Sequence, residues 1–281
     1  MLRIMKFGLN LFIWYDELGK LAYLIEKAKR VGYDAVEIFL QKLSPHDVVA
    51  ANHALRKFQV DCIGCIILPA EGDITSPDSN VRRKGVEILK RCVDTLVELD
   101  GQLMTGVTYA PWGKVKSEHP LEDWRRSVES LRQVCRYASE FGVKIGIEPI
   151  NRYRTYLVNT AEDAVKFVKD VGERNLGVHL DTYHMNIEED DFYKPIITAG
   201  KTLFHMHLSE NNRGILGTGH VDWDRVFQAL HDIGYDDYLV LEAYTPSLKD
   251  IAWKRTVPPP DVIASRSLEF MRNMARKYLR R

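Results

Sequence analysis

Short apolar runs alternate with longer amphipathic segments along nearly the whole chain. The runs predict strands, and the segments between them place apolar residues at the i, i+3, i+4 spacing of helices that bury one face. The predicted strands are Lys6–Trp14, Asp34–Leu40, Val60–Leu68, Gln102–Tyr109, Val143–Pro149, Leu176–Asp181, Thr202–Ser209 and Tyr238–Tyr244. The predicted helices are Lys20–Arg30, Asp47–Phe58, Asp78–Leu99, Leu121–Phe141, Thr160–Val171, Asp191–Ala199, Trp223–Ile233 and Pro260–Leu279.

The repeated strand-then-helix order predicts parallel strands joined by helical crossovers. The chain has 281 residues, and one (β/α)₈ barrel typically needs about 250. A doubly wound open sheet is the alternative, but the count of eight units and the absence of a glycine-rich turn after the first strand favour the barrel. We therefore predict one α/β domain, a TIM-barrel catalytic domain over residues 1–281, with the proline-rich segment Ile251–Asp261 as a loop inside it.

Signals at the helix ends support these boundaries. Thr160 and Asp163 suit a capping box at the start of their helix. Glycines that can cap a helix C-terminus follow four of the predicted helices: Gly32, Gly142, Gly200 and Gly234.

The charge balance narrows the classes of partner. Lys+Arg and Asp+Glu number 39 each, so no global field draws the protein to nucleic acid or to an anionic membrane. No segment approaches the roughly 18 uninterrupted apolar residues of a membrane span, and the N-terminal run lacks a signal-peptide cleavage pattern. We expect a cytoplasmic protein with no nucleic-acid or membrane partner. Cys62 and Cys65 form a C-x-x-C pattern inside an apolar strand, where they point to opposite faces, so we interpret them as buried thiols.

The polar residues at the ends of the predicted strands carry the candidate chemistry. In a (β/α)₈ barrel the carboxyl ends of the strands converge on one mouth. Glu148, Asp181 and Glu242 end the fifth, sixth and eighth strands, and the seventh carries His205 and His207. The two histidines share one strand face, so we favour His207 at the mouth and a core position for His205. An apolar strand that ends in an unpaired carboxylate is costly unless something binds it.

Three carboxylates and one imidazole make a hard, mostly oxygen ligand set. Such a set suits a divalent metal, Mn²⁺ first, with Co²⁺ or Mg²⁺ as alternatives, better than a structural zinc site, which prefers thiolates and histidines. We therefore predict one divalent metal ion at the mouth of the barrel.

Several longer motifs resemble a known family. They are EPINRY (148–153), LDTYHMNIEE (180–189), HMHLSENNRG (205–214), GTGHVDW (217–223) and LVLEAY (239–244). These stretches are similar to those of the ketose 3-epimerases, a group within the xylose-isomerase-like barrels that includes D-tagatose, D-allulose (psicose) and L-ribulose 3-epimerases. The resemblance covers nearly the whole chain and is densest from the fifth strand onward.

The resemblance implies a role for particular residues. The implied metal ligands are Glu148, Asp181, His207 and Glu242. Glu148 and Glu242 are implied to be the acid/base pair as well. The implied substrate contacts are His184, Arg213 and Trp112, although Trp112 in ordinary loop packing and Arg213 as a solvated loop charge are the alternatives. The resemblance also implies a small ketose as the substrate and a homodimer or homotetramer as the assembly.

The chemistry of a ketose suggests how such a site inverts C3. The C2 carbonyl and C3 hydroxyl can chelate one metal ion, which stabilises the cis-enediolate that forms when the C3 proton leaves. Inversion then requires a base on one face of the sugar and an acid on the other, which two glutamates can supply in alternation. No protein nucleophile and no organic cofactor is needed.

Two positions depart from the family pattern. Where the family carries a substrate-holding glutamate after the Asn-Arg-aromatic run, this chain has Arg154, and Asn10 stands where the sugar epimerases tend to carry an aromatic residue. We hypothesise that Arg154 faces the site and favours a carboxylate- or phosphate-bearing keto-sugar; a solvent-facing or ion-paired Arg154 is the alternative.

Three rival functions remain. An aldose–ketose isomerase would use the same metal set and differ only in its product. A DNA-repair endonuclease shares this barrel type, but it would need further metal ligands and a basic groove, which the zero net charge disfavours. A non-catalytic sugar-binding barrel would not need both glutamates.

Overall fold

The computed structural model of the protein describes residues 5–115, 121–248 and 258–279. Eight parallel strands form a closed barrel in chain order, which confirms the predicted (β/α)₈ fold. The barrel closes where β1 pairs with β8, through partners such as Gly8 and Val240. The strands are β1 (Lys6–Asn10), β2 (Ala35–Phe39), β3 (Asp61–Ile67), β4 (Leu103–Val107), β5 (Lys144–Ile147), β6 (Leu176–Asp181), β7 (Leu203–Leu208) and β8 (Tyr238–Leu241).

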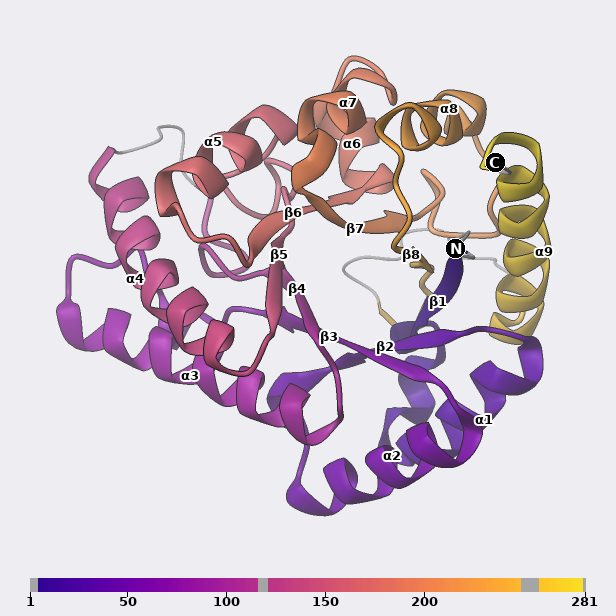
Figure 1. The fold of residues 1–281 in the computed structure, drawn as a ribbon, viewed down its shortest axis with the longest axis horizontal. Helices are drawn as coiled ribbons and strands as arrows, with labels where there is room; N and C mark the ends of the chain where they lie inside the picture. The colour runs from indigo at the N-terminus through magenta and orange to yellow at the C-terminus, as the bar shows by residue number, and fades with distance from the viewer. Residues whose placement is uncertain (1–4, 116–120, 249–257, 280–281) are drawn as a thin grey trace.

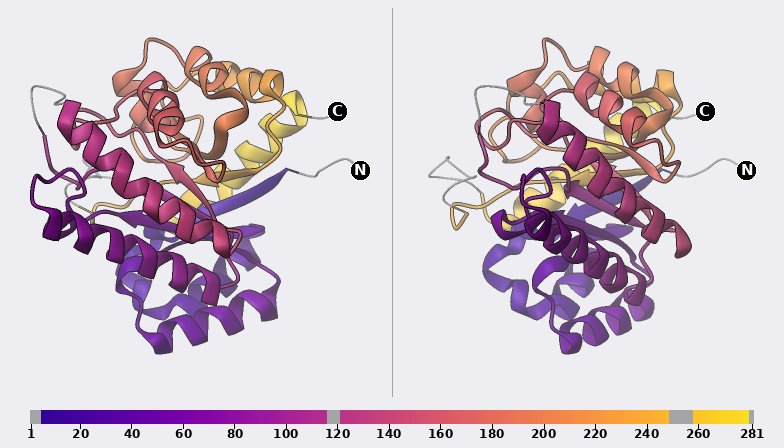
Figure 2. Two further views of the ribbon diagram at one scale, coloured as in Figure 1. Left: turned by 60° about the vertical axis from the view of Figure 1, so that its left-hand side comes forward. Right: turned by 90° about the vertical axis from the view of Figure 1, so that its left-hand side faces the viewer.

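Helices surround the barrel (Figure 1). They are α1 (Leu21–Val31), α2 (Pro45–Phe58), α3 (Ser79–Glu98), α4 (Leu121–Glu140), α5 (Ala161–Val171), α6 (Thr182–Glu188), α7 (Lys194–Ala199), α8 (Trp223–Ile233) and α9 (Pro260–Tyr278). The two longest, α3 and α4, lie side by side along the outside (Figure 2). Within the described ranges, no helix is both long enough and apolar enough to cross a membrane.

The strands are apolar because side chains on both faces of a barrel strand are covered. Every residue of β4 and of β6 is buried, since one face points into the barrel and the other lies under helices. All four cysteines are buried and free, as predicted for the pair in β3.

Local signals set the ends of several helices as the sequence predicts. The Thr160 hydroxyl oxygen accepts a hydrogen bond from the Asp163 amide, and the Asp163 carboxylate accepts one from the Thr160 amide, which completes the predicted capping box. Gly32 and Gly234 end α1 and α8 in the left-handed conformation (φ 111° and 68°), which glycine adopts without a Cβ penalty.

At the mouth of the barrel, one predicted strand was too long and one helix was not predicted. Leu11–Trp14 was predicted to extend the first strand, but β1 ends at Asn10 and the 3₁₀ helix η1 (Leu11–Lys20) follows. The Asn10 side chain accepts a hydrogen bond from the Phe12 amide and so turns the chain out of the sheet. Helix α6 was missed because it begins immediately after β6 and its N-cap is Asp181 itself.

The predicted loop Ile251–Asp261 lies mostly outside the described residues, and its last two residues begin α9. The remaining boundaries moved by a few residues only. β5 and β8 end at Ile147 and Leu241, so Glu148 and Glu242 stand one residue beyond their strands.

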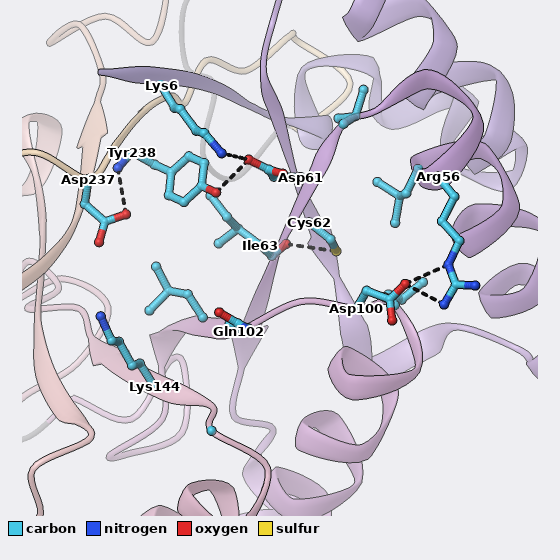
Figure 3. A pocket seen from close by; sticks show the side chains of 15 residues that line it. Lys6, Arg56, Asp61, Cys62, Ile63, Asp100, Gln102, Lys144, Asp237 and Tyr238 are labelled. Atoms are coloured by element: carbon cyan, nitrogen blue, oxygen red, sulfur yellow. Dashed lines mark hydrogen bonds and ion pairs between the residues drawn. The ribbon is translucent and has the colours of Figure 1, made fainter. Parts of the chain in front are cut away.

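The amino ends of the strands surround a charged basin at the other end of the barrel (Figure 3). The basin has a volume of about 430 Å³. Its side chains pair with one another: Lys6 contacts Asp61 at 2.5 Å, and Tyr238 donates to the same carboxylate at 2.8 Å. None of the predicted site residues lies here, and the described residues that line the basin include no histidine, so this basin is not the candidate active site.

Candidate active site

The structure brings the four strand-end residues together. Glu148, Asp181, His207 and Glu242 each offer a ligand atom within 4.8 Å of the others. All four side chains are buried, at 7%, 1%, 2% and 6% exposure. They come from β5, β6, β7 and β8, so the convergence follows from the parallel register of four neighbouring strands.

The cluster is suited to a cation. His207 Nδ1 lies 3.4 Å from Glu242 Oε1 and 3.9 Å from Glu148 Oε1, yet it has no hydrogen-bond partner among the described residues. A buried imidazole nitrogen that lies close to carboxylate oxygens and makes no hydrogen bond is suited to coordinate a metal ion. Three carboxyl groups and one imidazole within reach of one another also form a mostly oxygen donor set that a divalent cation fits.

A residue that the sequence reasoning missed holds His207 in place. Glu37, in the middle of β2, is 1% exposed, and its Oε2 lies 2.6 Å from His207 Nε2. Asn10 Nδ2 donates to Glu37 Oε2 at 2.9 Å, and Thr105 Oγ1 donates to Glu37 Oε1 at 2.5 Å. This arrangement fixes which ring nitrogen of His207 faces the carboxylates. The sequence did carry a signal, since Glu37 is the one carboxylate inside the apolar run AVEIFL (35–40).

Arg213 is a buried part of the cluster, so the alternative of a solvated loop charge was wrong. It is 2% exposed, and its guanidinium contacts Glu242 Oε2, Asp181 Oδ2 (3.0 Å) and Ser209 Oγ (2.7 Å). The guanidinium carbon also lies 3.8 Å from the Tyr183 ring centroid. One guanidinium nitrogen of Arg213 therefore contacts two of the three clustered carboxylates at once.

His184 is oriented by the turn after β5. Its Nδ1 accepts a hydrogen bond from the backbone amide of Asn151 at 3.1 Å, so the neutral ring carries its proton on Nε2, which lies 3.7 Å from Asp181 Oδ2. Burial and the charge of Arg213 hold the His184 pKa well below its usual value. The ring is therefore a neutral donor at the edge of the cluster.

Trp112 and Arg154 form one rim of the mouth. Trp112 lines the small cavity over the cluster together with His184 and Arg213. The Arg154 guanidinium carbon lies 5.5 Å from the Trp112 ring centroid, and the Gly113 amide donates to the Arg154 carbonyl at 2.8 Å. Trp112 is thus at the site, and Arg154 is half-buried beside it rather than directed into bulk solvent.

The two glutamates sit in opposite electrostatic environments. Burial raises the pKa of Glu148 well above its usual value, with Glu242 and Asp181 adding to the effect beyond what His207 offsets. Burial acts on Glu242 as well, but Arg213 and His207 outweigh it and hold the Glu242 pKa well below its usual value. The two carboxyls of the candidate acid/base pair thus differ in how strongly their surroundings favour the charged form.

His205 lies beneath the cluster, as the sequence argument expected of the histidine that is not at the mouth. It is completely buried, and neither ring nitrogen has a hydrogen-bond partner within the described part of the chain. Burial lowers its pKa to about 3, even though Glu37 works in the other direction.

This burial predicts a pH dependence of stability. Histidine has an ordinary pKa of about 6.5. At pH values between this and the lowered pKa of His205 in the folded protein, only the unfolded chain binds a proton at His205. The free energy of unfolding therefore falls as the pH falls. His205→Leu should make this slope shallower by about 1.4 kcal/mol per pH unit below pH 6. Chemical denaturation from pH 7 to pH 5 measures it. Replacing the exposed His53 with Gln should leave the slope unchanged; equal slopes in all three proteins would contradict the prediction.

A closed parallel barrel with clustered carboxylates and a histidine at the carboxyl ends of its strands defines the class: a TIM barrel with a candidate divalent-metal site at its mouth. Residues 25–274 match the model of the xylose isomerase-like TIM barrel family. The chain belongs to this family and, within it, to the ketose 3-epimerases.

Three relatives illustrate the membership. The chain is 35% identical to a ketose 3-epimerase of Arthrobacter globiformis, over 96% of this chain and 90% of the relative. It is 36% identical to a D-psicose 3-epimerase of Ruminiclostridium cellulolyticum, over 85% and 84%. The crystal structure of a D-allulose 3-epimerase from Methylomonas sp. in complex with D-allulose superposes with a TM-score of 0.90 at 32% identity, covering 97% of this chain and 98% of that one. Ketose 3-epimerases are isomerases that act on carbohydrates.

Proposed function

We propose that the protein inverts the configuration at C3 of a ketose of the D-tagatose, D-allulose or L-ribulose type. The observation that carries this proposal is the pair Glu148 and Glu242, two carboxyls that reach the same cluster from the separate strand ends of β5 and β8. The names of the relatives support the same reaction.

The proposed chemistry divides among the residues of the cluster. Glu148, Asp181, His207 and Glu242 would hold a divalent cation. When bound, that ion supplies a Lewis acid for the substrate's carbonyl and hydroxyl oxygens.

The two glutamates move the proton. One removes the proton from C3 on one face of the sugar, and the other delivers a proton to C3 on the opposite face. The reverse reaction exchanges their roles. His184, through Nε2–H, and Arg213 orient the substrate's oxygens, and Trp112 packs on the sugar.

Proton exchange in D₂O tests the proposal. Mn²⁺-loaded protein is incubated with neutral, acidic and phosphorylated ketoses, and the C3 and C1 hydrogens are followed separately by NMR. Deuterium at C3 with formation of the inverted product is expected. Exchange at C1 with formation of an aldose would instead establish an aldose–ketose isomerase, which the same cluster could also serve.

A second candidate substrate class rests on Arg154. Its guanidinium stands against Trp112 at the rim of the site, where the family pattern has a glutamate. A fixed cation there favours an acidic or phosphorylated keto-sugar over a neutral one.

Replacing Arg154 with Glu tests this preference. The variant should lower kcat/KM for an acidic ketose relative to a neutral one by about tenfold or more, because an attractive charge becomes a repulsive one. The same exchange assay gives the ratio. Arg174→Glu, at an exposed arginine before β6, is the matched control. An unchanged ratio in Arg154→Glu would exclude a role for this side chain in choosing the substrate.

We further propose that the whole chain forms one catalytic domain that works with Mn²⁺, or with Co²⁺ or Mg²⁺, as a homodimer or homotetramer in the cytoplasm. The ligand chemistry supports the choice of metal, and the family membership supports the assembly.

A further inference from the structure

A second, larger chamber opens beside the metal-ligand cluster. The cavity directly over the cluster has a volume of only about 40 Å³, whereas the neighbouring chamber has about 580 Å³. Asn10, Phe12, Ile67 and Tyr244 line both, so the two spaces meet at these side chains.

The wall of the chamber is a row of aromatic rings that begins at the cluster. Tyr244 donates a hydrogen bond to Glu242 Oε1 at 2.7 Å. The ring centroid of Phe12 lies 6.4 Å from that of Tyr244, 5.4 Å from that of Phe39 and 6.2 Å from that of Tyr15. Because Tyr15 is 42% exposed, the row leads from a buried metal-ligand candidate to the surface.

The middle of the chamber offers few polar groups. Among the described residues, Leu11, Leu18, Leu21, Ile38 and Leu43 line it. The inner polar residues, Asn10 and Glu37, are hydrogen-bonded to each other, and the carboxylate of Asp47, which also lines the chamber, accepts hydrogen bonds from Ser44. Lys42 is exposed and belongs to the outer rim. A flat, apolar group would fit these surroundings, whereas the hydroxyl groups of a second sugar would find little to bond with.

The size of the chamber also exceeds what a free ketose fills. Pockets of roughly 300–1,000 Å³ accommodate ligands of drug size, and the chamber alone is within this range.

We propose that the natural substrate is a keto-sugar that carries an apolar, ring-shaped substituent, and that the chamber behind Phe12 binds this substituent while the keto-sugar occupies the cluster. The proposal rests on the proposed C3 epimerase function and names its substrate class. The residues that would determine this substrate specificity lie in η1 and in the segment after β2, and they take no part in the proton transfer.

The test compares three ketoses that share one reacting end: the free ketohexose, the same ketohexose benzylated at its terminal hydroxyl, and a disaccharide that ends in it. C3 exchange in D₂O gives kcat/KM for each. Saturation-transfer NMR on the benzyl protons reports binding independently of turnover. We expect the benzylated sugar to exceed the free one in kcat/KM by about tenfold or more, the gain typical of burying an aromatic ring.

Chamber-filling variants complete the test. Leu18→Trp fills the chamber from η1, and Leu43→Trp fills it from the segment after β2; neither residue lines the small cavity over the cluster. Each should abolish the advantage of the benzylated sugar and its saturation transfer, while kcat/KM for the free ketose stays within about twofold. Val49→Trp, at a position 71% exposed on α2, is the matched control.

The outcomes separate this inference from the proposed function. If the free ketose exchanges at C3 but benzylation brings no advantage, or if the tryptophan variants leave that advantage intact, the chamber inference is overturned and the epimerase proposal stands. A disaccharide preferred over the benzylated sugar would overturn the apolar assignment. If no ketose exchanges, but benzyl saturation transfer is seen and is lost in Leu18→Trp, the epimerase proposal fails and the binding role of the chamber is supported.

Discussion

Replacing either glutamate of the cluster with glutamine is expected to stop interconversion of the two C3 epimers, with a loss of about 10²–10⁴-fold in rate. Each variant should still exchange hydrogen with D₂O, but in one epimer only. Glu148→Gln leaves Glu242 to act on the face of the sugar that it reaches, and Glu242→Gln leaves Glu148 to act on the other. The two variants should therefore exchange opposite epimers.

The physical basis is the separation of the two carboxyls in the barrel. They stand one residue beyond β5 and β8, with β6 and β7 between them, so they approach a bound sugar from different sides. The contact of Glu242 with Arg213 lowers the pKa of this carboxyl, whereas burial raises the pKa of Glu148, so the two carboxyls also differ in their surroundings. Neither residue can take over the role of the other without moving across the sugar.

The measurement is the deuterium content at C3 of each epimer, followed with time in both variants. Because both glutamates are also candidate metal ligands, Mn²⁺ content is measured in parallel, and the assay is run at saturating metal. Glu71→Gln, at an exposed residue of η3 (Ala70–Gly72), controls for the substitution itself. Exchange of the same epimer by both variants, or interconversion at the wild-type rate, would contradict the division of roles.

Glu37→Gln is expected to weaken metal binding by about 10–100-fold, although Glu37 is not among the four clustered ligand candidates. The carboxylate contacts His207 Nε2 at 2.6 Å and turns Nδ1 toward Glu148 and Glu242. Burial favours the neutral acid, but the charge of His207 beside it holds the Glu37 pKa below its usual value. In Glu37→Gln, a neutral amide replaces the carboxylate whose charge makes Nδ1 a strong electron-pair donor to a metal ion.

Isothermal titration with Mn²⁺ measures this effect, and thermal unfolding of the metal-free protein separates it from a loss of stability. Glu210→Gln is the matched control. Glu210 is equally buried, but it accepts hydrogen bonds from the Gly217 amide and the Trp223 indole. The control should lower the melting temperature with little change in Mn²⁺ affinity. Unchanged affinity in Glu37→Gln would mean that the carboxylate has only a structural role.

Glu37 also shows where sequence reasoning stopped. The periodic pattern predicted β2, and the carboxylate was visible inside it. Only the closed barrel reveals that a residue in the middle of β2 meets the histidine of β7, because the side chains that point into a barrel come from strands far apart in sequence.

The sequence by itself determined the eight strand–helix units, since apolar periodicity follows directly from which faces are buried. It also predicted the four strand-end residues, because parallel register carries the ends of neighbouring strands to one mouth. Tertiary structure alone decided the rest. The burial of Arg213 between Asp181 and Glu242 and the aromatic chamber behind Phe12 both depend on contacts between segments remote in sequence. Such contacts leave no local pattern, because they are set by how the closed barrel brings loops together.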